Sequence, residues 1–252
     1  MKNTVSIRGI NIGTGMPKIC VSLIGKDNNE LNQEIEHLKN MKVDIAEWRM
    51  DHYREIEKIE KVEEALRVIR TAWGDKPLLA TFRSKKEGGE QEVSQEYYIK
   101  LNKSVIDTGM ADLVDVELFS EEKTVKKLME YAHQKNVKVI MSNHDFDKTP
   151  NKEEIVDRLC KMQQMDADIL KIAVMPQNTE DVLTLLGATN EMVTKHANRP
   201  VVTMAMGKLG LVSRLSGEIF GSAITFGAAQ IASAPGQISA KELRNILEVM
   251  HQ

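Results

Sequence analysis

The sequence predicts a single (β/α)8 barrel, the TIM-barrel α/β fold, preceded by a short β-hairpin. Two observations predict it. Eight short apolar runs alternate with eight segments of helical periodicity, and residues 1–252 contain no linker, composition break or internal repeat that would divide them. An open, doubly wound sheet would show the same alternation. In a barrel, the carboxyl ends of all eight strands surround one opening, so residues far apart in the sequence can meet there.

The elements follow one another in a regular order. The hairpin is expected within residues 1–15, where residues 5–7 and 10–12 flank Arg8-Gly9. The eight strands are expected at residues 18–23, 43–49, 78–83, 113–118, 137–144, 167–175, 201–206 and 220–226. Apolar stripes of helical spacing follow the strands in turn: Leu31, Ile35, Leu38; Ile56, Ile59, Val62, Leu66, Ile69; Tyr97, Leu101, Val105; Val125, Leu128, Met129, Ala132; Ile155, Leu159, Met162; Val182, Leu185, Leu186, Val193; a short segment ending at Leu215; and Leu243, Ile246, Leu247, Met250.

Composition excludes several classes of protein. A formal net charge of -3 gives no electrostatic reason to expect nucleic acid or an anionic membrane surface as a partner. No signal-peptide core and no run of about 18 apolar residues is present, so a cytoplasmic protein is expected. Cys20 and Cys160 are predicted to be free thiols, and no cluster of His, Cys, Asp and Glu has the spacing of a metal site.

A lysine interrupts the apolar strand expected at residues 167–175. Side chains alternate along a strand, so Ile169, Lys171 and Ala173 share one face, and Leu170 and Ile172 share the other. Lys171 could lie on an edge strand and reach water with its ammonium group. Alternatively, it is an amine in a low-dielectric pocket, where the neutral form is favoured and can attack a carbonyl carbon to form a Schiff base.

Charged residues also occur near the ends of other expected strands. Glu47 and Arg49 share a face of the second strand, which a surface ion pair between them would also explain. Arg83 ends the third strand, and His144 ends the fifth. Each of these residues has an ordinary structural explanation when taken alone, but solvated charges on the surface do not explain why five strands carry charge at the same end.

Two further features concern the fourth strand and the loop after the last strand. Asp115 and Glu117 share a face of the fourth strand, which is unfavourable in a barrel interior unless they are paired or lie near a cation. The loop at residues 227–238 is rich in small residues and precedes the capping-box sequence Ser239-Ala240-Lys241-Glu242. The loop is predicted to be an active-site lid, although it could be a simple connector.

Taken together, these motifs resemble those of type I 3-dehydroquinate dehydratase, the Schiff-base enzyme family of the shikimate pathway. The most specific match is Asp115-Val116-Glu117-Leu118 followed, after a spacer of twenty residues, by Val139-Ile140-Met141-Ser142-Asn143-His144-Asp145. The other matching segments are Glu47-Trp48-Arg49, Thr81-Phe82-Arg83, Glu87-Gly88-Gly89, the strand of Lys171, Arg214, and Ser233-Ala234-Pro235-Gly236-Gln237. The resemblance runs from about Lys18 to the carboxyl terminus.

The resemblance implies a reaction and a set of roles. Syn-elimination of water from 3-dehydroquinate would give 3-dehydroshikimate, on the route to chorismate and the aromatic amino acids, without a cofactor or metal. Lys171 would form the imine, His144 would act as general base and acid, and Glu87 would orient His144. Arg214 would bind the substrate carboxylate. The remaining substrate-binding residues would be Glu47, Arg49, Arg83, Ser22, Met204, Phe226, Ser233 and Gln237. Family members are typically homodimers, so a homodimer is expected.

Two other functions remain open from the residues themselves. A class I aldolase of a small keto acid or sugar would share the barrel and the strand-end lysine. An aldolase for phosphorylated sugars should also have a glycine-rich helix entry after the last strands, which the sequence lacks. A non-catalytic protein that binds a small carboxylate would use Lys171 and Arg214 only as charge partners. Trapping of an imine by borohydride would separate these possibilities.

Overall fold

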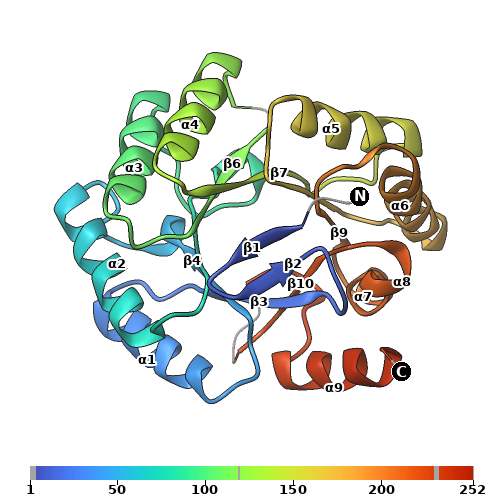
Figure 1. The fold of residues 1–252 in the computed structure, drawn as a ribbon, viewed down its shortest axis with the longest axis horizontal. Coiled ribbons are helices and arrows are strands. Elements are labelled where there is room, and N and C mark those ends of the chain that lie inside the picture. Colours follow the sequence, from blue (N-terminus) through green and yellow to red (C-terminus); the bar gives the residue numbers. More distant parts are fainter. Residues whose placement is uncertain (1–3, 119, 230–232, 252) are drawn as a thin grey trace.

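The computed structural model describes residues 4–118, 120–229 and 233–251. It contains an antiparallel hairpin and one sheet of eight parallel strands (Figure 1). The hairpin strands are β1 (Val5–Ile7) and β2 (Ile10–Ile12). The parallel strands are β3 (Lys18–Leu23), β4 (Ile45–Arg49), β5 (Leu78–Thr81), β6 (Leu113–Glu117), β7 (Lys138–Asp145), β8 (Ile169–Val174), β9 (Val201–Ala205) and β10 (Ile224–Gly227).

The parallel strands form a nearly closed barrel. Strands adjacent in the sequence pair in order from β3 to β9, and β10 returns to pair with β3. The remaining gap is bridged by a hydrogen bond from the Ala223 N–H to the Val201 carbonyl at 2.7 Å. The prediction of a barrel with an N-terminal hairpin is therefore confirmed over the open sheet.

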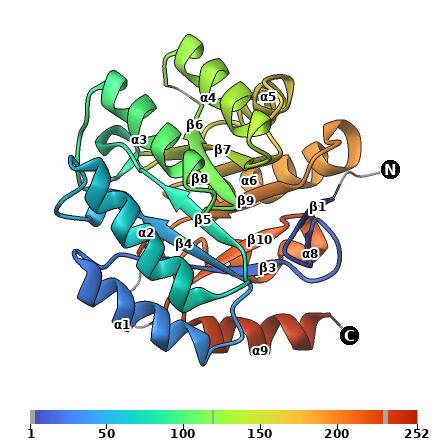
Figure 2. The same ribbon diagram turned by 60° about the vertical axis from the view of Figure 1, so that its left-hand side comes forward.

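Helices surround the barrel on its outer side (Figures 1 and 2). The helices are α1 (Asn28–Lys39), α2 (Ile59–Trp73), α3 (Gln95–Asp107), α4 (Glu122–Gln134), α5 (Lys152–Gln164), α6 (Thr179–Glu191), α7 (Leu211–Leu215), α8 (Gly217–Phe220) and α9 (Ala240–Met250). Two 3-10 turns, η1 (Met50–His52) and η2 (Lys85–Glu87), follow β4 and β5, and a π turn, η3 (Met192–His196), extends α6. None of the described helices is long and apolar enough to cross a membrane.

Alternation along the strands divides the core into two layers. Ile169 and Ala173 pack inside the barrel, whereas Leu170, Ile172 and Val174 pack between the sheet and the helices. This confirms the predicted faces of the strand that carries Lys171. Other apolar side chains of the barrel interior pack against the hairpin residues Val5, Ile7 and Ile12. The hairpin, dark blue at the centre of Figure 1, therefore covers one end of the barrel.

One predicted strand starts too early. The structure begins β10 at Ile224, not at residue 220, and residues 217–220 form the short helix α8. Gly221 ends this helix with a φ of 100° and bonds back to the Gly217 carbonyl at 2.7 Å. The apolar pair Ile219-Phe220 therefore belongs to the helix, and Ile219 is 66% exposed. Two smaller differences concern helical stripes, because Ile56 precedes α2 and Val193 lies in η3.

Several local predictions can also be compared with the structure. Cys20 and Cys160 are free, the first buried and the second half-buried. Ser239 caps α9 by accepting the Glu242 N–H, as the capping-box sequence predicts. In the expected lid at residues 227–238, Gly227 ends β10, and residues 230–232 lie outside the described residues.

Candidate active site

A cavity of about 200 Å³ lies at the carboxyl ends of the barrel strands. Every residue that the sequence singled out for catalysis or substrate binding lines this cavity: Ser22, Glu47, Arg49, Arg83, Glu87, His144, Lys171, Met204, Arg214, Phe226, Ser233 and Gln237. These residues come from strands and loops spread over more than two hundred positions of the chain. The barrel brings them together because its parallel strands all end at one opening.

Lys171 lies in the middle of β8 and is buried. Strands β7 and β9 flank it on both sides, with Ser142 and Val202 as its register partners. The edge-strand alternative is therefore wrong. Its Nζ lies 3.9 Å from Glu47 Oε1, 3.8 Å from Asp115 Oδ2 and 4.4 Å from the centre of the Phe226 ring.

Glu47 and Arg49 do not pair with each other. Glu47 accepts hydrogen bonds from Ser22 Oγ at 2.5 Å and Thr81 Oγ1 at 2.8 Å, from the strands on either side. The Arg49 guanidinium turns toward Asp51, to which Nε and Nη2 each donate at 2.7 Å. The alternative of an ion pair within β4 is wrong because each of these two side chains has a nearer partner.

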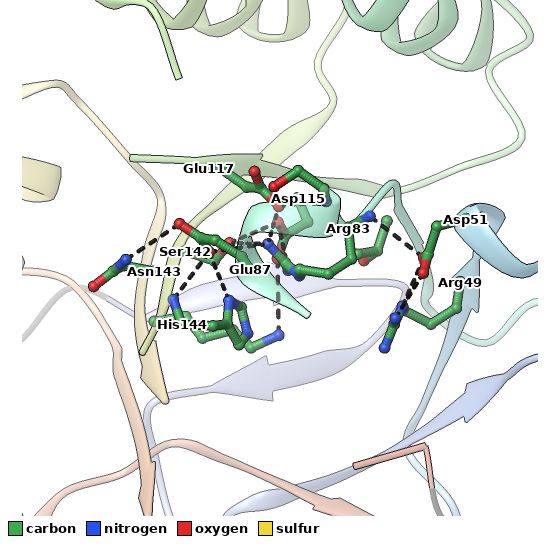
Figure 3. Close-up of polar contacts among 12 residues, drawn as sticks. Arg49, Asp51, Arg83, Glu87, Asp115, Glu117, Ser142, Asn143 and His144 are labelled. Atoms are coloured by element: carbon green, nitrogen blue, oxygen red, sulfur yellow. Dashed lines mark hydrogen bonds and ion pairs between the residues drawn. The ribbon is translucent and has the colours of Figure 1, made fainter. Parts of the chain in front are cut away.

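Arg83 pairs with both carboxylates of β6. It contacts Asp115 Oδ1 through Nη2 and Glu117 Oε1 through Nη1, each at 2.8 Å, and Nη1 also donates to Ser142 Oγ at 3.0 Å (Figure 3). Burial alone would lower the pKa of Arg83, but these carboxylates raise it above its usual value, so the cation is permanent. The expectation that Asp115 and Glu117 require a nearby cation is confirmed.

The half-buried His144 pairs with the buried Glu87. The Nδ1 atom of His144 lies 2.9 Å from Glu87 Oε2, which also accepts the His144 backbone N–H at 2.9 Å (Figure 3). Since this oxygen already serves as an acceptor, we assign the shared proton to Nδ1, which leaves Nε2 as the free ring nitrogen. Asn143 Nδ2 donates to the other carboxylate oxygen of Glu87 at 3.2 Å.

The protonation of this pair is set by burial and by neighbouring cations. Burial, followed by the positive charges of Arg83, Lys171 and Arg49, holds the pKa of His144 well below its usual 6.5. Burial also raises the pKa of Glu87, although Arg83 opposes this effect. The lowered pKa of His144 leaves its imidazole neutral near pH 7, so it can accept a proton.

Arg214 is a buried cation without a carboxylate partner among the described residues. Its Nη2 donates to the Pro235 carbonyl at 3.1 Å, and Nη1 makes long contacts with the Phe226 carbonyl at 3.5 Å and Met204 Sδ at 3.6 Å. The buried Nε has no hydrogen-bond partner in the part of the chain that the structure describes. Burial lowers the pKa of Arg214 to about 10, so the side chain remains charged at neutral pH. Such a group suits an anionic ligand.

The described part of the loop at residues 227–238 lies over the cavity. Ser233 Oγ donates to Ser22 Oγ at 3.0 Å, and Gln237 Nε2 donates to Ser233 Oγ at 3.1 Å. Gly236 has a φ of 79°, and a Cβ atom there would lie 2.1 Å from the Gly207 carbonyl oxygen. This position therefore favours glycine for both its conformation and its close packing.

Comparison with known proteins agrees with this geometry. The family described as type I 3-dehydroquinase matches residues 19–252. The chain is 54% identical over 252 residues to the 3-dehydroquinate dehydratase of Clostridioides difficile, covering 100% of this chain and 99% of that one. It is also 54% identical to the enzyme of Escherichia coli strain K12, covering 99% of each chain.

The chain belongs to the type I 3-dehydroquinase family. It catalyses the hydro-lyase reaction of this family in the shikimate pathway, dehydrating 3-dehydroquinate through a lysine Schiff base. A crystal structure of the Clostridioides difficile enzyme with covalently modified comenic acid superposes with a TM-score of 0.98, at 54% identity over 100% of this chain and 99% of that one. The structure of the Enterococcus faecalis 3-dehydroquinate dehydratase superposes with a TM-score of 0.93 at 42% identity, covering 98% of this chain and 100% of that one. This assignment selects the dehydratase over the aldolase and the non-catalytic binder.

The type I 3-dehydroquinase cavity also contains residues that the sequence analysis did not select. They are Gly88, Phe146, Ala173, Met206, Ala234 and Pro235. Asp51, the partner of Arg49, was not selected either. It lies two positions after Arg49, a spacing that would have placed both on one face of an extended strand, but the chain turns into η1 at this point. Phe146 is close to Gly88, where a Cβ atom would lie 2.3 Å from its ring.

No group of three or more His, Cys, Asp and Glu side chains in the described ranges could hold a metal ion.

Proposed function

We propose that Lys171 is the Schiff-base nucleophile of this 3-dehydroquinate dehydratase and that His144 is its general base and acid. The observation that carries the proposal is the position of Lys171: its Nζ is buried in the cavity and makes no hydrogen bond to the described residues, with His144 lining the same cavity. An amine held in this way needs little reorganisation before it attacks a carbonyl carbon.

The proposed reaction proceeds through an imine. The neutral amine attacks C3 of 3-dehydroquinate, and the resulting carbinolamine takes up one proton and loses water to form a protonated imine; the proton is released again when the imine is hydrolysed. The imine withdraws electrons and acidifies the C2 proton, which His144 Nε2 accepts. The protonated His144 then gives a proton to the departing C1 hydroxyl, which leaves as water. Hydrolysis of the imine consumes one water, releases 3-dehydroshikimate and restores Lys171.

Glu87 and Arg214 complete the proposed machinery. Glu87 accepts a hydrogen bond from His144 Nδ1–H, which fixes the orientation of the imidazole. Its carboxylate also stabilises the imidazolium that forms when Nε2 is protonated. Arg214 binds the substrate carboxylate, which supplies the anionic partner that the described residues do not.

The other predicted residues are proposed to hold the substrate ring. Glu47 and Arg49 bind ring hydroxyls. Arg83 contributes the donors of its guanidinium that Asp115, Glu117 and Ser142 leave free. Ser233 and Gln237 contact the substrate from the lid and Ser22 contacts it from β3, whereas Met204 and Phe226 line the apolar part of the cavity.

Borohydride reduction in the presence of 3-dehydroquinate tests the nucleophile. We expect a stable adduct on Lys171 in the parent, none on Lys171→Ala, and an adduct without product on His144→Ala. Lys138→Ala is a matched control because Lys138 lies at the opposite end of β7 and pairs with Asp168. An unmodified parent chain, or a histidine variant that dehydrates substrate at the parent rate, would contradict the assignment.

We also propose that the protein is a homodimer of the cytoplasm. Support for the dimer is the resemblance to a typically dimeric family, and the two free thiols are consistent with a reducing compartment. Light scattering should give twice the chain mass of 28.4 kDa, and cell fractionation should recover the activity in the cytoplasmic fraction. A monomeric mass or recovery outside the cytoplasm would contradict these two proposals.

A further inference from the structure

Asp51 is a fully buried carboxylate just beyond the carboxyl end of β4. It holds the Arg49 guanidinium in a two-point contact, with Nε and Nη2 each 2.7 Å from its oxygens (Figure 3). Its Oδ2 also accepts the Glu90 N–H at 3.1 Å, and its Oδ1 lies 3.4 Å from the Arg83 N–H that points toward it. One side chain therefore joins three segments that surround the cavity.

The two-point contact determines which part of Arg49 remains available. The Nε and Nη2 edge of the guanidinium is occupied by Asp51, whereas Nη1 makes no hydrogen bond with the described residues. Because a guanidinium is planar and rigid, fixing one edge fixes the direction of the other. Arg49 lines the cavity, so its remaining donors are held in one orientation there.

The contact also resolves a charge problem in the site. Glu47 lies on the same strand as Arg49 and would attract its guanidinium, yet Glu47 has to remain near Lys171 and Ser22. Because Asp51 holds the Arg49 guanidinium away from Glu47, Arg49 does not compete with Lys171 and Ser22 for the Glu47 carboxylate. Burial lowers the pKa of Arg49 by itself, and Asp51 raises it above its usual value, so both groups are ionised at neutral pH.

We propose that Asp51 is a positioning residue for the substrate, acting through Arg49. It sets the direction in which the Arg49 guanidinium presents Nη1 to a ring hydroxyl of 3-dehydroquinate. This inference rests on the proposed contact between Arg49 and the substrate. The competing explanation is that Asp51 only stabilises the fold by joining η1 to the loop that contains Glu90.

A double-mutant cycle separates the two explanations. Asp51→Asn retains the shape but loses the charge, and Arg49→Lys retains the charge but loses the planar fork. We expect each single variant to raise KM and to lower kcat/KM by about 10- to 100-fold, with kcat within a few-fold of the parent. The double variant should be no worse than Arg49→Lys alone, because without the fork Asp51 has nothing to orient.

Each result of the cycle has a defined meaning. Two results would overturn the role of Asp51 and leave the Arg49 contact intact. One is a double variant in which the fold-losses of kcat/KM of the two single variants multiply. The other is an unchanged KM in Asp51→Asn while Arg49→Lys is impaired. An unchanged kcat/KM in Arg49→Lys would overturn the Arg49 contact itself, and the inference with it.

A matched control and a measurement on the parent enzyme complete the test. Asp44 lies before the other end of β4, where it accepts the Ile19 N–H at 2.7 Å and contacts Arg244 at 2.6 Å. Asp44→Asn should lower Tm but leave KM unchanged, and a rise in KM equal to that of Asp51→Asn would support the purely structural explanation.

If Asp51→Asn does not fold, ¹⁵N NMR of the arginine-labelled parent still tests whether Asp51 holds Arg49. The Arg49 Nε–H signal is identified by its disappearance in Arg49→Lys, and its proton should exchange slowly with solvent. Exchange as fast as that of an exposed arginine would overturn the inference.

Discussion

Replacing Arg214 by methionine should stabilise the ligand-free protein while impairing substrate binding. The charged guanidinium is buried, and its Nε has no hydrogen-bond partner within residues 4–118, 120–229 and 233–251. A pKa of about 10 in place of 12.5 corresponds to about 3 kcal/mol of unfavourable free energy for the charged form. Methionine fills a similar volume without a charge, so this cost disappears.

Part of the gain is offset by lost hydrogen bonds. The 3.1 Å bond from Nη2 to the Pro235 carbonyl contributes about 1 kcal/mol, but this carbonyl also accepts the Gly207 N–H at 3.1 Å and is not left unpaired. The two other contacts of the guanidinium are long. A net gain of about 1–2 kcal/mol should raise Tm by about 2–8 °C for a domain of this size.

Differential scanning calorimetry and steady-state kinetics test this prediction together. Arg214→Met should show a higher Tm without ligand, a KM raised by about 100-fold or more, and no further rise in Tm when substrate is added. Arg70→Met is the control. Arg70 contacts Asp112 at 2.6 Å, so its replacement should lower Tm. A lower Tm for Arg214→Met, or an unchanged KM, would refute the reasoning.

Three further predictions concern pH and the lid. The pKa of His144 lies well below 6.5 and the base must be neutral, so proton abstraction from the preformed imine, measured in single turnovers, should not slow through protonation of His144 until the pH falls to that lower value; a His144 imidazole found by NMR to be protonated at pH 7 would contradict this. Gly236→Ala should raise KM, because the new Cβ would clash with the Gly207 carbonyl and displace this part of the loop. Gly9→Ala is the control, since Gly9 has the same φ of 79° with open space around it, and its KM should equal that of the parent. Equal KM values for the two variants would contradict the steric argument. Gln237→Ala should raise KM by loss of a substrate contact, and an unchanged KM would return the loop to a connector role.

Local patterns were sufficient to predict the alternating strands and helices, and the closure of the barrel was settled by the pairing of β10 with β3. The period of the apolar residues depends only on neighbours within a few positions, and it predicted seven of the strands within two residues at each end. The eighth failed at its start because an apolar pair in the short helix α8 resembles the beginning of a strand, and the turn at Gly221 separates the two. Propensity alone does not distinguish these alternatives in so short a segment.

The sequence by itself determined that eight strands alternate with helices and that a lysine, a histidine and several arginines lie at one end of these strands, since strand direction and side-chain alternation follow from local geometry. Only the tertiary structure decided how these groups pair. It turned Arg49 toward Asp51, engaged Arg83 with the carboxylates of β6, and left Arg214 without an anion among the described residues. Pairing depends on distances between segments remote in the chain, such as Ser22 and Ser233, which are 211 positions apart. No local pattern encodes such distances, and the closure of the barrel sets them.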